Sequence, residues 1–188
     1  MISGPTRPVA ARLGITRRLF QLLDTAADET PCVTVVQGPL LAGKTHLASA
    51  TAAEALGRSF RVVEVDARQS KLPFYVVDRL TRQLGVRSEG QTNDLARLHG
   101  LRLACQRAAA GRAGLAIIVD NAEFLAPGDA EVIHDLIVSP PLGAFFCLLT
   151  VGSDASARRA ISELVGNLGV QRVRSQWFSL DPLADEEV

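Results

Sequence analysis

A glycine-rich segment in the first third of the chain has the residue types and spacing needed to hold a phosphate group. It runs Gly38-Pro-Leu-Leu-Ala-Gly43-Lys44-Thr45 and fits the pattern G-x-x-x-x-G-K-[ST]. Glycines let the backbone approach an anion closely, and the amide N–H groups of such a turn point at the anion from the start of the next helix. The lysine then reaches the β- and γ-phosphate oxygens, and the threonine hydroxyl is a ligand of Mg²⁺.

The expected nucleotide contacts form one continuous stretch, and we expect the nucleotide to be ATP or ADP. The predicted residues are Gly38, Pro39, Leu40, Leu41, Ala42, Gly43, Lys44, Thr45 and His46. Lys44 is informative because the only other lysine is Lys71 and every other cationic side chain is an arginine. His46 lies just past the motif, where it can instead pack against the helix or cap it.

A second candidate group ends the apolar stretch at residues 115–120, Leu-Ala-Ile-Ile-Val-Asp. We predict that Asp120 lies at the carboxyl end of a buried strand and holds Mg²⁺ through water. Thr45 and Asp120 are then the predicted metal-site residues. The alternative is that Asp120 only caps the end of the strand.

The residues after Asp120 bear on hydrolysis. Hydrolytic proteins with this loop commonly carry Glu or Asp at the next position, where this chain has Asn121. An amide orients water but cannot accept its proton, and general-base catalysis typically contributes about 10²–10⁴-fold, so we expect weak intrinsic hydrolysis. Glu123 either turns back toward the site or stays solvated outside it. The candidate catalytic residues are therefore Asp120, Asn121 and Glu123.

The composition is that of one globular domain with no net charge. The 188 residues include 20 Lys+Arg and 20 Asp+Glu, and 47% are hydrophobic, so the chain can bury its own core. Zero net charge disfavours nucleic-acid binding by this segment alone. The three cysteines are isolated, as expected for buried thiols in a reducing compartment, and no apolar stretch is long enough to span a membrane. We therefore expect a cytoplasmic protein with no membrane partner.

Short β-branched runs alternate with amphipathic stretches, which is typical of an α/β fold. Predicted strands cover residues 32–37, 60–66, 115–120 and 144–151, with a fifth inside 170–180; predicted helices cover 15–27, 44–56, 73–84, 94–110, 129–137 and 155–168. Strands separated by helices favour right-handed crossovers and a parallel sheet.

The sequence predicts three segments. Residues 1–13 are expected to be a non-helical leader, because prolines at positions 5 and 8 disfavour a helix. Residues 14–180 form the core. Residues 181–188 have the acidic, proline-containing pattern of a helix start, and too few residues follow to complete that helix. The family resemblance described next implies that they open a helical lid or linker missing from this chain.

Four segments, taken in order, resemble P-loop ATPases of the AAA+/STAND type, and in particular the ATPase core of large LuxR-type transcription regulators. They are residues 38–45, 119–125 (Val-Asp-Asn-Ala-Glu-Phe-Leu), 147–153 (Cys-Leu-Leu-Thr-Val-Gly-Ser) and 178–187 (Phe-Ser-Leu-Asp-Pro-Leu-Ala-Asp-Glu-Glu). The resemblance implies a three-layer P-loop NTPase fold with a five-stranded parallel sheet of order 5-1-4-3-2 and helices on both faces. It also implies that the fourth strand ends beside the γ-phosphate, where Thr150 or Ser153 would be the polar sensor.

Two functions fit these expectations. The resemblance favours an ATP-binding regulatory module whose nucleotide state controls an attached effector, such as the DNA-binding domain of a transcription regulator. The alternative is an active AAA+-type ATPase that loads or remodels a DNA or protein assembly. Expected partners are the nucleotide, a downstream effector or lid domain, and further copies in nucleotide-dependent self-association. A small-molecule kinase is disfavoured because no arginine-rich lid insertion lies between the third and fourth strands.

Overall fold

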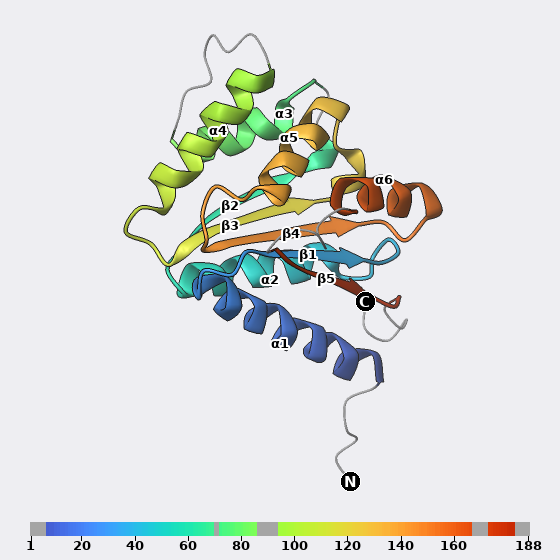
Figure 1. Cartoon of the computed structure of the whole chain (residues 1–188). Helices are drawn as coiled ribbons and strands as arrows, with labels where there is room; N and C mark the ends of the chain where they lie inside the picture. The colour runs from blue at the N-terminus through green and yellow to red at the C-terminus, as the bar shows by residue number, and fades with distance from the viewer. Residues whose placement is uncertain (1–6, 70–71, 86–93, 167–172, 183–188) are drawn as a thin grey trace.

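Five parallel strands form one sheet at the centre of the fold (Figure 1). The computed structural model describes residues 7–69, 72–85, 94–166 and 173–182. The strands are β1 (Cys32–Gln37), β2 (Phe60–Asp66), β3 (Gly114–Asp120), β4 (Phe145–Val151) and β5 (Arg174–Ser179). Their order across the sheet is β2-β3-β4-β1-β5, and every neighbouring pair is parallel, which confirms the predicted topology.

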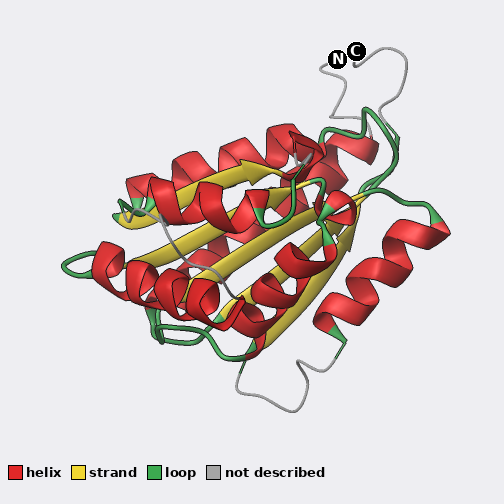
Figure 2. Ribbon diagram, turned by 90° about the horizontal axis from the view of Figure 1, so that it is seen from above, coloured by secondary structure: helices red, strands yellow, loops and turns green. Residues whose placement is uncertain are grey.

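Helices cover both faces of the sheet and complete three layers (Figure 2). They are α1 (Arg7–Ala27), α2 (Lys44–Gly57), α3 (Tyr75–Gln83), α4 (Asp94–Ala109), α5 (Pro127–Val138) and α6 (Ala155–Val165), with short 3-10 turns η1 (Ala67–Gln69) and η2 (Ala122–Phe124). The α1 and α2 helices pack on one face, and α3 to α6 pack on the other.

The central strands are buried on both faces because alternate side chains enter two separate apolar clusters. Every residue of β3 and β4 is buried. Ile117 and Val119 join the cluster under α3 to α6, while Ala116 and Ile118 join the cluster under α1 and α2. This explains the continuous apolar runs that marked these strands in the sequence. The three cysteines also lie inside these clusters, and burial raises the pKa of the Cys147 thiol to about 12.

The first helix begins earlier than the sequence predicts. It starts at Arg7, so the predicted start at residue 15 and the non-helical assignment of residues 7–13 were wrong. Pro8 is the second residue of the helix, where a missing N–H costs no hydrogen bond because first-turn amides have no acceptor within the helix. The earlier start brings Arg12 and Thr16 beside the phosphate-binding loop.

The parallel arrangement gathers the ends of four strands at one edge of the sheet. Asp66 and Asp120 are register partners on β2 and β3, and Val36 and Thr150 are partners on β1 and β4. The loop at residues 38–43 follows β1 at the same edge. The candidate residues of the sequence therefore converge, as the carboxyl ends of parallel strands require.

A buried carboxylate on α5 caps α3. Phe74, which precedes α3, has φ 61° and no capping side-chain bond. Instead, Oδ1 of Asp129 accepts a hydrogen bond from the Val77 amide at 2.9 Å. Asp129 is fully buried, and burial raises its pKa against the opposing effect of these backbone amides. The capping bond fixes α3 to α5 across the helical layer.

We expect Asp129→Ala to lower the free energy of unfolding by about 1–2 kcal/mol, because the buried Val77 amide loses its acceptor. Urea unfolding followed by circular dichroism measures the change. Asp129→Asn keeps an acceptor oxygen and should lose less stability. Equal losses in the two variants would contradict the capping role.

Candidate functional site

The loop between β1 and α2 has a left-handed backbone at two positions. Leu41 has φ 62° and Gly43 has φ 81°. Such a turn points successive amides into a concavity that suits an anion. Gly38 is required for a different reason, because a Cβ there would lie 3.0 Å from the Leu180 Cβ and 3.2 Å from the Ala42 Cβ.

Lys44 is buried and folds back over the loop. Its Nζ donates hydrogen bonds to the backbone oxygens of Gly38 and Pro39, both at 2.8 Å. Burial lowers the pKa of Lys44, against the opposing effect of the nearby Glu123 and Asp120 carboxylates. The ammonium group therefore lies inside the loop, bonded to neutral carbonyl oxygens that a phosphate would replace favourably.

Asp120 connects three elements at the end of β3. Its Oδ2 accepts a hydrogen bond from the Thr45 hydroxyl of α2 at 2.7 Å, and its Oδ1 accepts one from the Thr150 hydroxyl of β4. Thr150 also accepts a hydrogen bond from the Asn121 amide at 2.9 Å. The predicted metal-site pair is thus in direct contact, and the predicted sensor Thr150 is fully buried against it.

Asn121 adopts a left-handed backbone and turns its side chain toward β2. Its φ is 57°, and its Nδ2 donates to Oδ1 of Asp66 at 3.0 Å. Asp66 also accepts bonds from the Arg68 guanidinium, the shortest at 2.9 Å. Burial raises the pKa of Asp66, but the bonds from Arg68 and Asn121 outweigh it and leave the pKa below its usual range.

Glu123 turns back toward the site, which decides between the two alternatives that the sequence leaves open. On η2, its Oε1 accepts a hydrogen bond from the Gly152 amide at 2.9 Å. Its Oε2 is buried and has no hydrogen-bond partner among the residues that the structure describes. Its charge acts on Lys44 more strongly than that of Asp120 does. The Glu123 carboxylate therefore belongs to the same charged cluster as Lys44 and Asp120.

The remaining predicted residues lie further from this centre. Leu40 and Leu41 are exposed at the tip of the loop. Ser153 is exposed, and its hydroxyl makes no hydrogen bond within the described ranges. Of the two candidate sensors, only Thr150 contacts Asp120.

Two hollows flank the loop. One, of about 300 Å³, lies beside α1 and is lined by Arg12, Thr16, Ala42, Gly43, His46, Leu47 and Leu180. His46 therefore faces a hollow next to Gly43 rather than the loop itself. Neither Arg12 nor Thr16 could be recognised from the sequence, because their contribution depends on how α1 packs.

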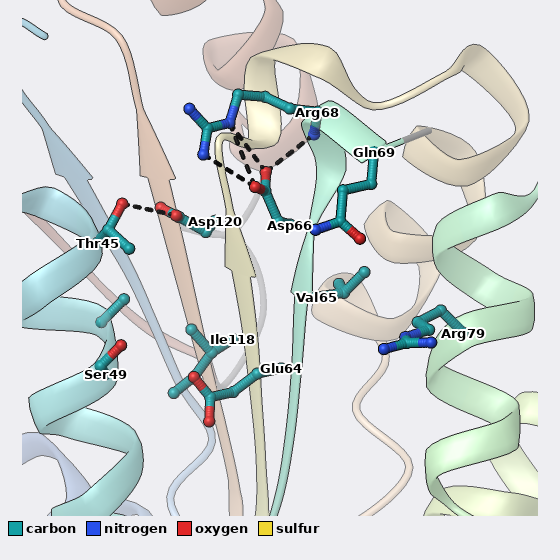
Figure 3. Close-up of a pocket in the computed structure, with 11 residues that line it drawn as sticks. Thr45, Ser49, Glu64, Val65, Asp66, Arg68, Gln69, Arg79, Ile118 and Asp120 are labelled. Carbon is teal, nitrogen blue, oxygen red and sulfur yellow. Dashed lines mark hydrogen bonds and ion pairs between the residues drawn. The ribbon is translucent and has the colours of Figure 1, made fainter. Parts of the chain in front are cut away.

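The other hollow, of about 270 Å³, lies between α2 and the ends of β2 and β3 (Figure 3). Thr45, Asp120, Asp66, Arg68 and Glu64 are among its lining residues. Burial and the Asp120 charge raise the pKa of Glu64. The sequence analysis missed Arg68, although its position two residues after a strand-ending aspartate places it at the same sheet edge.

The residues of this edge fit a magnesium nucleotide. The loop amides and Lys44 suit phosphate oxygens, and the Thr45 hydroxyl and Asp120 carboxylate are hard oxygen ligands of the kind Mg²⁺ prefers. A sequence model of AAA domains matches residues 27–151, which is more than half of the chain. The chain belongs to the AAA domain family. Its fold is that of the P-loop ATPases in this family.

Solved structures with the same fold include three archaeal AAA proteins. The Aeropyrum pernix ORC1 protein in complex with DNA is 20% identical, with a TM-score of 0.71 over 94% of this chain and 46% of its own. The A. pernix ORC2 protein, solved as ADPNP and ADP complexes, is 18% identical, and its TM-score is 0.67. The match covers 100% of this chain and 51% of the ORC2 chain. Cdc6p from Pyrobaculum aerophilum is 18% identical, and its TM-score is 0.64. The match covers 91% of this chain and 46% of the Cdc6p chain.

These matches concern the fold of the AAA domain alone. The chain spans about half the length of each of the three archaeal proteins. No curated protein matches the chain. Within the described residues, no helix is both long and apolar enough to cross a membrane.

We expect Thr150→Val to lower the free energy of unfolding by about 1–3 kcal/mol, because the buried Asn121 amide and Asp120 oxygen each lose a partner. Thr150→Ser keeps the hydroxyl and serves as the matched control. Chemical unfolding at neutral pH measures both variants. A Thr150→Val protein as stable as wild type would show that the hydroxyl does not hold this edge together.

Proposed function

We propose that this AAA domain binds ATP with Mg²⁺ and works as the ATPase module of an assembly that acts on DNA or on other proteins. The observation that carries the proposal is the convergence of Lys44, the Thr45–Asp120 pair and the buried Glu123 carboxylate on one phosphate-binding loop. Support for an assembly comes from the fold shared with ORC and Cdc6 proteins, one of them solved with DNA.

The phosphates would lie on the loop amides, with Lys44 leaving the carbonyl oxygens of residues 38 and 39 for the β- and γ-phosphates. Thr45 and Asp120 would hold Mg²⁺, which neutralises phosphate charge when bound. The hollow beside α1 adjoins Gly43, so it suits the base and ribose. Thr16 and His46 supply polar groups there, and Leu47 and Leu180 supply apolar surface.

Glu123 is the better candidate for the general base. Asn121 donates its amide to Asp66 and has no carboxylate to accept a proton. Glu123 has a buried oxygen without a hydrogen-bond partner among the described residues, and its charge acts on Lys44, so we infer that it takes a proton from water attacking the γ-phosphate. Its other oxygen is held by the Gly152 amide, which fixes the orientation of the carboxylate.

A regulatory module that controls an attached effector is the second candidate. Its support is Asn121, because an amide beside Asp120 favours long-lived nucleotide binding over rapid turnover. Zero net charge also suggests that DNA contacts would depend on neighbouring domains or partner subunits. The two candidates differ in turnover, which is measurable with and without duplex DNA.

We expect Lys44→Ala to weaken MgATP binding by at least about tenfold, because a buried cation that would meet several phosphate oxygens is lost. Titration calorimetry measures the affinity. Lys71→Ala removes the only other lysine and is the matched control. Unchanged affinity in Lys44→Ala would contradict the nucleotide site.

We expect Glu123→Gln to lower ATP turnover by about 100-fold or more while the affinity for MgATP stays within a few fold, as loss of a general base predicts. Phosphate release measures turnover. Asn121→Asp restores a carboxylate at the position next to Asp120 and is the comparison. If Glu123→Gln keeps wild-type turnover and Asn121→Asp raises it, residue 121 and not Glu123 is the base position.

A further inference from the structure

Arg68 and Asp66 form an ion pair that lines the hollow beside Thr45 and Asp120, outside the phosphate-binding loop. Arg68 of η1 donates from Nη2 to Oδ2 of Asp66 at 2.9 Å and from Nε to Oδ1 at 3.2 Å. The Arg68 amide also donates to Asp66 Oδ1 at 3.0 Å. The arginine is about half exposed (52%), whereas its partner is mostly covered (23%), so the arginine is the part of the pair that can leave.

Arg68 faces the same hollow as the predicted metal-site pair. Thr45, Asp66, Arg68 and Asp120 all line it. Figure 3 shows the guanidinium extending past Asp66 toward the Thr45–Asp120 pair. Its charge acts on Asp120, Glu123 and Lys44, which are the groups that would surround a γ-phosphate. Its Nη1 makes no hydrogen bond within the described part of the chain.

Bound Mg²⁺ and Lys44 would compensate the negative charge of a triphosphate only in part, because the Asp120 and Glu123 carboxylates offset some of their positive charge. Arginine presents several donors in a planar fork that matches phosphate oxygens. The described residues around this hollow include one other arginine, Arg79 on α3, which forms no ion pair among them.

We propose that Arg68 contacts the γ-phosphate of bound ATP and lets the chain distinguish ATP from ADP, with Asp66 holding the arginine when no γ-phosphate is present. This rests on the proposed nucleotide site. Arg68 exchanges one anionic partner for another, so the guanidinium has an anionic acceptor both before and after ATP binds. Asp66 keeps its bond to Asn121 when Arg68 leaves, so the end of β3 stays in place.

The test compares affinities for MgADP and for Mg²⁺ with a non-hydrolysable ATP analogue, measured by calorimetry on the full chain. We expect Arg68→Ala to weaken the analogue by about tenfold and ADP by less than about twofold, because only the analogue carries the γ-phosphate. Arg79→Ala removes the same charge from the same hollow and should leave both affinities unchanged. Melting temperatures check that each variant is folded.

A double variant, Asp66→Asn with Arg68→Ala, separates contact from repulsion. If Arg68 contacts the γ-phosphate, the analogue-specific loss persists in the double variant. Recovery of wild-type affinity would mean that the loss came from the unpaired Asp66 charge and would overturn the proposal. Equal weakening of ADP and the analogue in Arg68→Ala would also overturn it.

Ligand binding by the wild type and by Lys44→Ala separates a failure of the Arg68 proposal from a failure of the nucleotide site. If wild type binds both ligands and Lys44→Ala does not, the nucleotide site stands, and unchanged discrimination in Arg68→Ala removes only the Arg68 proposal. If wild type binds neither ligand, the nucleotide site fails and the Arg68 proposal fails with it.

Discussion

The organisation of the site depends on the carboxylate of Asp120, which accepts hydrogen bonds from α2 and β4 while it ends β3. The Thr45 hydroxyl occupies one oxygen and the Thr150 hydroxyl the other. Because Thr150 also receives the Asn121 amide, the left-handed turn after β3 is held in the same network. That turn places Glu123 against Gly152, so the end of β3 links α2, β4 and Glu123 in one network.

The electrostatics of the edge follow from this arrangement. The buried Asp120 and Lys44 lie at the same edge as the half-buried Glu123, and each has a partner that a magnesium nucleotide would replace or join. Lys44 uses neutral carbonyl oxygens, and Arg68 uses Asp66. Lys44 is therefore already buried, and the Arg68 guanidinium is already held by an anion, before the ligand arrives, which lowers the cost of binding.

The sheet could be predicted because its signals are local. Apolar runs that end in Gln37 and Asp120 locate β1 and β3. The glycine spacing after Gln37 locates the loop before α2. The start of α1 could not be predicted, because Pro8 is tolerated only in a first turn whose position depends on packing. Glu123 contacts Gly152, which is distant in sequence. Arg68 bonds to the nearby Asp66, but its place in the hollow lined by Thr45 and Asp120 depends on how the strands pair.

A crystal structure of the chain with Mg²⁺ and a non-hydrolysable ATP analogue would locate the phosphates directly. We expect phosphates on the amides of residues 41–45, Mg²⁺ between Thr45 and Asp120, and Lys44 Nζ on phosphate oxygens instead of the carbonyls of residues 38 and 39. A structure in which the analogue lies elsewhere, or in which Lys44 keeps both carbonyl bonds beside a bound analogue, would contradict the proposed nucleotide site.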